Sequence, residues 1–342
     1  MSWIELSLDT THEAVDWACT LLANAIAAED IQIHEYSALQ ADTFQADTLQ
    51  NDRRWTFTIR LYLLEDAHIY QRIDAIAFIL KPLHRTGMTS ELQKSVIDQK
   101  PPEVLQNLEN SLIRRIGDRF VVISANSGYQ IKNPQEIILR LQNSLAFGSG
   151  LHPATILSLQ LLERHVKPLL HTLDLGSGSG ILSVAIAKLG ATVLAVDNDP
   201  IAVSATEDAV QRNHVAQSVT AMCGSLGAAS KLGHWMGGNS SESVPAIAAD
   251  AQFDLIVANI FARVHISLAV EFYEALQSTA KHSGILITSG YTNDREEDIT
   301  LAMSTAGFTV CDREQLDEWS AMSFYKPNKL NNYEDMVSTS SI

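Results

Sequence analysis

The chain has 342 residues, of which 46% are hydrophobic, enough to fill two cores and to exclude an intrinsically disordered protein. Its 40 acidic residues outnumber the 24 basic ones and give a formal net charge of −16. This balance, without a local basic patch, argues against binding to phosphate backbones and suits a basic protein partner, although the charge can equally serve solubility alone.

Residues 1–100 alternate between the hydrophobic spacings of strands and of amphipathic helices. The pattern predicts strands at Trp3–Leu8, Ile31–Tyr36 and Trp55–Leu64, and helices at His12–Ala27 and Asp66–Lys81. The order strand, helix, strand, strand, helix indicates a ferredoxin-like α+β domain. A fourth strand has only a weak candidate near Ser95–Ile97.

Pro101-Pro102 interrupts this pattern and opens a connector that we place at residues 101–145. We expect a helix at Glu103–Ile116 and strands at Arg119–Ser124 and Glu136–Leu141. The boundary between two domains therefore falls in this region.

Residues 146–326 alternate strand and helix patterns, which predicts a parallel, doubly wound α/β sheet. Helices are predicted at Thr155–His165, at Ile181–Leu189 and from Pro200, with Asp199 as the N-cap of the third. Strands are predicted at Leu173–Leu175, before Asp197, at Val219–Cys223, at Phe253–Asn259 and at Gly284–Ser289. A terminal hairpin is predicted to pair Phe308–Arg313 with Trp319–Tyr325. Leu226–Gln252 reads as a mobile surface insertion, and residues 327–342 as a disordered tail.

A glycine motif follows the strand at Leu173–Leu175, with Gly176, Gly178 and Gly180 at every second position. Glycines have no side chain, so a ligand can lie directly against the backbone where the next helix begins. Asp197 ends the following strand, where a carboxylate can accept hydrogen bonds from both hydroxyls of a ribose. The glycine turn alone is weak evidence for a ligand site, but together with Asp197 it predicts a site for an adenosine-type cofactor.

The glycine spacing and Asp174 distinguish between the adenosine cofactors. Dinucleotide sites use G-x-G-x-x-G, whereas the third glycine here comes one position early, at Gly180. A carboxylate at Asp174 is unfavourable beside a pyrophosphate but favourable beside the ammonium and sulfonium of S-adenosylmethionine. The pattern D-x-G-x-G-x-G therefore favours S-adenosylmethionine over the nicotinamide cofactor of a dehydrogenase.

A second motif, Phe253-Asp-Leu-Ile-Val-Ala-Asn-Ile-Phe261, places Asn259 at the carboxyl end of a strand. Open α/β sheets bind their ligands at these ends. An amide oxygen there can accept the N–H of a neutral amine and direct its lone pair at a sulfonium methyl group. Without the glycine motif upstream, Asn259 would be better interpreted as the cap of a turn.

Several segments together resemble the ribosomal protein L11 methyltransferases, the PrmA family. They are Ala146-Phe-Gly-Ser-Gly-Leu-His-Pro-Ala-Thr155, Leu173-Asp-Leu-Gly-Ser-Gly-Ser-Gly-Ile-Leu182, Val196-Asp-Asn-Asp-Pro-Ile-Ala202, Val257-Ala-Asn-Ile260 and Asp317-Glu-Trp319. The first segment is the distinguishing one, because glycine motifs occur in many methyltransferases. The N-terminal pattern is also similar to the family's substrate-recognition domain, so the resemblance covers nearly the whole chain.

The resemblance implies a Rossmann-like class I methyltransferase sheet beside the N-terminal ferredoxin-like domain. It implies methylation of lysine ε-amines and of the N-terminal α-amine of ribosomal protein L11, at the base of the large-subunit stalk, with no direct reading of nucleic acid. The residues it places at S-adenosylmethionine are Thr155, Gly176, Gly178, Asp197 and Asn259. It places Phe147 beside Asn259 at the methyl-transfer site, with Ser149 nearby, and leaves His152 a structural role.

The chain departs from the family pattern near the connector. Gln142-Asn143-Ser144 stand where Asp-Pro-Gly is usual, Ser149 stands where Thr is usual, and Gln99–Ile116 contains no tryptophan. These changes leave cofactor binding intact and keep other substrates open: another basic protein, a nucleic-acid base, or none at all in a non-catalytic ribosome-assembly factor. A base methyltransferase would be expected to show Asn-Pro-Pro-Tyr/Phe where this chain reads Asn259-Ile-Phe-Ala262.

Cys19, Cys223 and Cys311 are scattered and suggest neither a disulfide framework nor a metal site. The first residues lack a basic segment followed by an apolar core, and no apolar run is long enough to cross a bilayer. We therefore expect a cytoplasmic protein without membrane contact. We also expect a monomer.

Overall fold

The computed structural model describes residues 3–11, 14–23, 26, 30–35, 55–99, 113–124, 127–141, 152–227, 244–278 and 283–328. The chain divides into two compact units. The first comprises Met1–Leu108 with Asn143–His152, and the second comprises Glu109–Gln142 with Pro153–Ile342. Each unit is described by itself.

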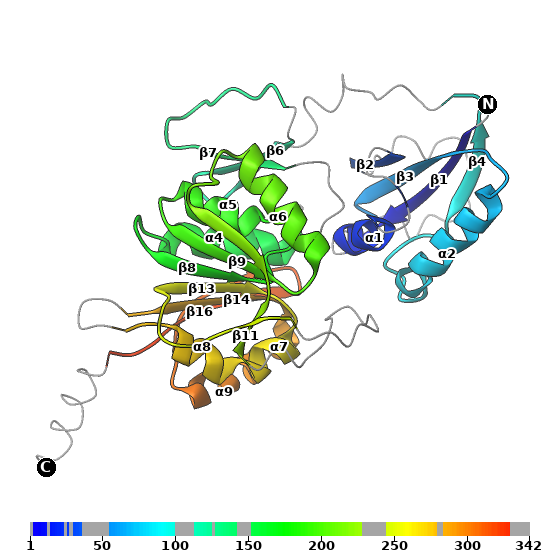
Figure 1. Cartoon of the computed structure of the whole chain (residues 1–342). Helices are drawn as coiled ribbons and strands as arrows, with labels where there is room; N and C mark the ends of the chain where they lie inside the picture. Colours follow the sequence, from blue (N-terminus) through cyan, green and yellow to red (C-terminus); the bar gives the residue numbers. More distant parts are fainter. Residues whose placement is uncertain are drawn as a thin grey trace, which may run out of the picture. The chain divides into compact units, whose positions relative to one another are not determined.

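The first unit contains a four-stranded antiparallel sheet in the order β2-β3-β1-β4 (Figure 1). Its elements are β1 (Trp3–Thr10), α1 (Ala14–Ala23), β2 (Ile31–Glu35), β3 (Phe57–Leu64), α2 (Ile69–Arg85) and β4 (Gln93–Ile97). Alternate residues of β1 are buried, as the period-two pattern predicts. This chain order and strand order confirm the ferredoxin-like fold, and the weak candidate for a fourth strand is β4.

The second unit begins with a small sheet of β5 (Arg114–Ile116), β6 (Phe120–Ser124) and β7 (Ile137–Leu141). The helix predicted over Glu103–Ile116 is therefore wrong at its carboxyl end, and its residues 103–112 lie outside the described ranges. Arg114–Ile116 pairs with β6 across a tight turn at Gly117, whose φ is +60°. Cross-strand pairing overrides the helical spacing here.

The second unit continues into a seven-stranded sheet in the order β10-β9-β8-β13-β14-β16-β15. Its strands are β8 (His171–Leu175), β9 (Thr192–Asp197), β10 (Val219–Cys223), β13 (Leu255–Asn259), β14 (Ile285–Thr292), β15 (Thr309–Leu316) and β16 (Trp319–Tyr325). The first five are parallel, and β16 runs antiparallel to both β14 and β15. This sheet confirms the predicted Rossmann-like fold.

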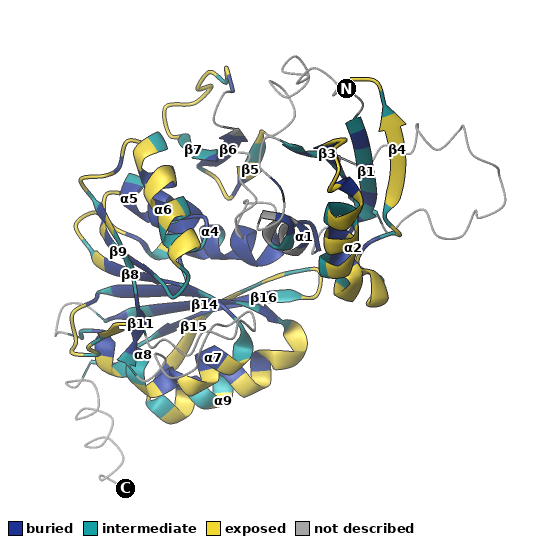
Figure 2. Cartoon of the chain, turned by 45° about the vertical axis from the view of Figure 1, so that its right-hand side comes forward, coloured by how far each residue is buried: buried dark blue, intermediate teal, exposed yellow. Residues whose placement is uncertain are grey.

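Helices cover both faces of this sheet (Figure 1). The elements outside the sheet are α4 (Pro153–His165), α5 (Ile181–Lys188), α6 (Pro200–Arg212), α7 (Ala262–Ser267), α8 (Ala269–Ala275), the 3₁₀ helix η4 (Asn293–Arg295), α9 (Glu296–Ala306), and the short paired strands β11 (Ser225–Leu226) and β12 (Ala246–Ile247). Val257 packs in the apolar layer beneath α4 and α5, whereas its neighbour Ile256 packs on the side of α8 and α9. Figure 2 shows the resulting buried sheet between helices whose outer sides are exposed. None of the helices in the described ranges combines the length and the apolar composition needed to cross a bilayer.

Candidate active site

The carboxyl ends of three neighbouring strands bring the predicted site residues into one row. β8 lies between β9 and β13, with Leu175 paired to Val196 and to Ala258. The next residue on each of the three strands is therefore Gly176, Asp197 or Asn259. From β8 the chain first moves outward through β9 and β10, then crosses to the other side as β13 and β14. Such a reversal of strand order is where open α/β sheets bind ligands.

The glycine turn after β8 requires glycine at each of its three positions. Gly176, Gly178 and Gly180 have φ angles of +79°, +54° and +76°, in the left-handed region that other residues rarely adopt. A Cβ at Gly180 would also lie 2.8 Å from the Cα of Thr206 on α6. The absence of side chains therefore serves both the turn and the close packing of α5 against α6.

Asp197 is fixed by main-chain amides. Its Oδ2 accepts the N–H of Gly178 at 3.0 Å, and its Oδ1 accepts the N–H of Asp199 at 3.0 Å. Burial raises the pKa of Asp197, and these hydrogen bonds oppose the rise. The main-chain N–H of Asn198 is a third donor to this carboxylate, which leaves about one of its four acceptor sites for a ligand. The side chain is thus positioned by the turn and can still accept a hydrogen bond from a ligand hydroxyl.

Asp174 lies wholly buried under the same turn. The Ser183 hydroxyl on α5 donates to its Oδ2 at 2.6 Å, whereas its Oδ1 is buried and has no hydrogen-bond partner in the described part of the chain. Burial raises the pKa of Asp174 to about 7, Asp197 adds to the rise, and Ser183 opposes it. A carboxyl group with one oxygen unsatisfied therefore lies two residues before the glycine turn.

Asn259 and Thr155, predicted separately, meet in the structure. The Nδ2 of Asn259 donates to the Oγ1 of Thr155 at 3.3 Å, and Thr155 is wholly buried in the first turn of α4. The Oδ1 of Asn259 is buried and accepts no hydrogen bond from the residues that the structure describes. The amide is thus oriented through its nitrogen and retains an unused acceptor.

Two further residues hold this end of β13 and were not found from the sequence. Gly290 on β14 has a φ of +89°, and a Cβ there would lie 2.6 Å from the carbonyl oxygen of Ile260 and 2.9 Å from the Oδ1 of Asn259. The Nε2 of His265, on α7, lies 2.9 Å from the carbonyl oxygen of Ser289. A carbonyl only accepts, so Nε2 carries the proton. Burial lowers the pKa of His265 to about 4, which keeps the ring neutral.

Three further residues were considered at the site from the sequence: Phe147, Ser149 and His152. Phe147 and Ser149 lie outside the described residues, so their placement at the site stays a prediction. His152 is wholly buried. Within the described ranges, no three His, Cys, Asp or Glu side chains are grouped as metal ligands.

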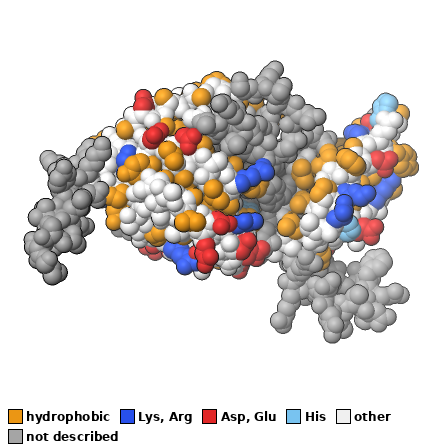
Figure 3. Space-filling model, turned by 90° about the horizontal axis from the view of Figure 1, so that it is seen from below, with side chains coloured by type: hydrophobic (Ala, Val, Ile, Leu, Met, Phe, Trp, Pro, Cys, Tyr) orange, Lys and Arg blue, Asp and Glu red, His pale blue; other side chains and the backbone are white. Residues whose placement is uncertain are grey.

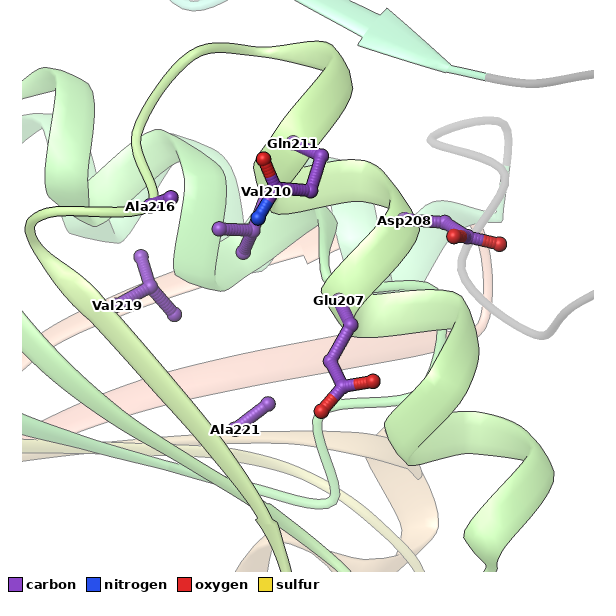
Figure 4. Close-up of a pocket in the computed structure, with 7 residues that line it drawn as sticks. All are labelled: Glu207, Asp208, Val210, Gln211, Ala216, Val219 and Ala221. Carbon is purple, nitrogen blue, oxygen red and sulfur yellow. The ribbon is translucent and has the colours of Figure 1, made fainter.

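A cavity of about 390 Å³ opens elsewhere, between α6 and β10 (Figure 4). Its lining residues are Glu207, Asp208, Val210, Gln211, Ala216, Val219 and Ala221. None of them belongs to the glycine turn or to the row at the carboxyl edge, and the β10 residues that line it precede Cys223, the pairing partner of Asp197. We therefore do not place the reaction there.

On the face drawn in Figure 3, basic and acidic side chains are interspersed, without a continuous basic field.

Comparison with known proteins gives matches over nearly the whole chain. The family model described as ribosomal protein L11 methyltransferase (PrmA) matches residues 2–327. The ribosomal protein L11 methyltransferase of Herpetosiphon aurantiacus is 36% identical over 337 residues, 96% of this chain and 100% of its own. The one from Chloroflexus aurantiacus is 35% identical over 334 residues, 95% of this chain and 98% of its own.

Among solved structures, the ribosomal protein L11 methylase of Lactobacillus delbrueckii subsp. bulgaricus superposes with a TM-score of 0.51 at 24% identity. The match covers 63% of this chain and 99% of that chain, and it supports the fold alone. The family match and the two relatives identify the family of the chain. The chain belongs to the ribosomal protein L11 methyltransferase (PrmA) family of S-adenosylmethionine-dependent methyltransferases.

Proposed function

We propose that this chain uses S-adenosylmethionine to methylate lysine ε-amines and the N-terminal α-amine of ribosomal protein L11, a component of the large-subunit stalk base. The observation that carries the proposal is the row of Asp197, Gly176 and Asn259 at the point where the strand order reverses. The names of the relatives supply the substrate.

The residues present fit the cofactor. The glycine turn offers backbone free of Cβ atoms, and the carboxylate of Asp197 keeps acceptor capacity for a ribose hydroxyl. Two buried oxygens, Oδ1 of Asp174 and Oδ1 of Asn259, have no partner among the described residues. Buried polar atoms in native proteins are normally satisfied, so these two oxygens suit the cationic and hydrogen-bonding groups of a ligand.

When bound, S-adenosylmethionine supplies a methyl group that is already activated by its sulfonium. What the chain must contribute is binding, orientation and exclusion of water. We assign Thr155, Gly176, Gly178, Asp197 and Asn259 to cofactor binding. The Oδ1 of Asn259, with Phe147, is assigned to the approach of the amine. His265 is not a candidate base, because its ring is wholly buried and burial lowers its pKa to about 4.

The proposal extends to the organisation of the chain. We assign substrate recognition to a ferredoxin-like domain at residues 1–100, a connector to residues 101–145, catalysis to residues 146–326, and a tail to residues 327–342. A ribosomal substrate favours a cytoplasmic location. The net charge of −16 favours a basic protein as partner, and we propose that the enzyme acts as a monomer.

The test is incubation with labelled S-adenosylmethionine and purified L11, other ribosomal proteins and ribosomal RNA, followed by mass spectrometry. We expect label at amines of L11 with the wild type and with Asp208→Ala, an exposed carboxylate on α6 that serves as control. Asp197→Ala should weaken cofactor binding by about 1–3 kcal/mol through lost hydrogen bonds to a charged group. Label in RNA or in another protein alone would overturn the substrate. Cofactor binding without any transfer would favour a non-catalytic assembly factor.

A further inference from the structure

Asp174 is a buried acid whose surroundings favour its neutral form. The Ser183 hydroxyl donates to one of its oxygens, the main-chain N–H of Ser183 also acts on the carboxyl group, and the other oxygen is buried with no donor among the described residues. An ionised carboxylate normally accepts several hydrogen bonds or pairs with a cation when it is buried. Asp174 therefore lacks part of the stabilisation that ionisation requires.

Among the described residues, the elements packed around Asp174 supply no positive charge. Its pairing partners on the neighbouring strands, Ala195 of β9 and Val257 of β13, are apolar. α5 contributes the uncharged Ser183, and the charged group that acts on Asp174 is the carboxylate of Asp197, at the end of β9. No salt bridge between described residues includes Asp174.

The two carboxyl groups are bonded to the segment that forms the glycine turn and the start of α5. Asp197 is bonded to the amide of Gly178 within the turn, and Asp174 is bonded to the first turn of the helix that Gly180 opens. A cation lying on the glycine turn would feel the field of both groups, in a setting where charges interact more strongly than in water. It would supply the positive charge that Asp174 otherwise lacks.

We propose that Asp174 is protonated in the free protein and ionises when the cationic end of the methyl donor binds over the glycine turn, so that donor binding releases a proton to solvent. The O–H bond of Asp174 breaks, its electron pair stays on the carboxylate, and the buffer takes the proton. The inference rests on the proposed function and identifies Asp174 as the residue that couples donor recognition to pH.

The size of the effect follows from the titration of the free protein. With a pKa of about 7, Asp174 carries a proton in about nine of ten molecules at pH 6 and in about one of ten at pH 8. Donor binding should therefore release close to one proton at pH 6 and little at pH 8. The affinity for the donor should rise as the pH is raised through this range and then level off.

The experiment is isothermal titration calorimetry of the full chain with S-adenosylmethionine, at pH 6 and pH 8, in buffers of different ionisation enthalpy. The dependence of the observed heat on the buffer gives the number of protons released. 5′-Methylthioadenosine serves as the control ligand, because it keeps the adenosine and lacks both the sulfonium and the ammonium. We expect proton release at pH 6 with the donor and none with the neutral ligand.

Three variants assign the proton to its residue. Asp174→Asn should bind the donor with no proton release at pH 6, and Asp208→Asn, an exposed carboxylate on α6, should release as the wild type does. Ser183→Ala keeps Asp174 but removes its hydroxyl donor, which raises the protonated fraction, so release at pH 8 should increase. Ser183→Ala tests the proposal even where Asp174→Asn does not fold.

The outcomes separate the two proposals. Donor binding without proton release at pH 6, or equal release by Asp174→Asn, overturns the role of Asp174 and leaves the proposed function standing. Unchanged release at pH 8 in Ser183→Ala also overturns it. A wild-type chain that does not bind S-adenosylmethionine at all overturns both.

Discussion

The side-chain amide of Asn259 donates a hydrogen bond to the hydroxyl of Thr155, across 104 residues of sequence and at 3.3 Å. The bond ties the end of β13 to the first turn of α4. Because this bond engages the amide nitrogen, the amide oxygen is the atom that has no hydrogen-bond partner among the described residues. The two residues act as one unit, which links the proposed cofactor site to the packing of α4.

Thr155→Val tests this unit, because it keeps the shape of the side chain and removes the acceptor. The Nδ2 of Asn259 then loses its partner, at a cost of about 1–3 kcal/mol. We expect methyl transfer to L11 to fall about tenfold or more in kcat/KM. Ser158→Ala is the matched control, since Ser158 is buried one turn further along α4 and its hydroxyl donates to the carbonyl of Ala154 within the same helix. Equal activities of the two variants would contradict the role of Thr155.

Gly290→Ala should displace Asn259 directly. The new Cβ would lie 2.6 Å from the carbonyl oxygen of Ile260 and 2.9 Å from the Oδ1 of Asn259, and the φ of +89° is strained for alanine. We expect a loss of at least about 1–2 kcal/mol in the free energy of unfolding, with impaired methyl transfer. Gly128→Ala is the control, because no atom lies within 4 Å of its Cβ position. Denaturant unfolding and the methylation assay measure both effects, and a Gly290 variant as active as the control would refute the close contact.

Asp199→Ala should affect stability and leave the cofactor site in place. The Asp199 side chain caps α6 by accepting the N–H of Ile201 at 2.9 Å, whereas its own main-chain N–H, which any residue retains, donates to Asp197. We expect the free energy of unfolding to fall by about 1 kcal/mol, as for other N-cap replacements. Affinity for S-adenosylmethionine, measured by calorimetry, should be retained. Asp208→Ala, on the exposed side of the same helix, should change neither quantity.

The segment from Leu173 to Asp199 could be predicted from the sequence because its signals are local. A short apolar strand, a glycine turn, a helix and a second strand follow one another without a long connection. The N-cap at Asp199 and Pro200 at the first helical position form as predicted. The order of these elements also predicts the Rossmann-like sheet, since parallel strands require crossover helices.

The contacts that orient Asn259 could not be predicted, because they join segments far apart in the chain. Gly290 could have been noted as a glycine inside a strand pattern, which often marks close backbone approach. Nothing local to His265 indicates that its ring bonds the carbonyl of Ser289. Arg114–Ile116 is a strand and not the end of the predicted helix, because Gly117-Asp118 forms a turn that pairs it with the apolar residues of β6.

His265→Gln should make the chain less sensitive to acid. The folded protein holds this ring neutral, with its pKa lowered to about 4, whereas an unfolded histidine titrates near 6.5. Both states are neutral at pH 7. As the pH falls below 6.5 only the unfolded state binds the proton, so stability is lost progressively, and the loss is complete once the pH has passed below 4. The complete loss in the free energy of unfolding is about 3 kcal/mol.

Glutamine can still donate a hydrogen bond towards the carbonyl of Ser289 but does not titrate in this range. Urea unfolding at pH 7 and pH 4.5 should therefore show the variant gaining about 2–3 kcal/mol relative to the wild type on acidification. Other titrating groups, including Asp174, act equally in both proteins and cancel in this difference. His214→Asn, at an exposed position, should follow the wild type. Parallel pH dependence of His265→Gln and the wild type would show that the ring is not held neutral by burial.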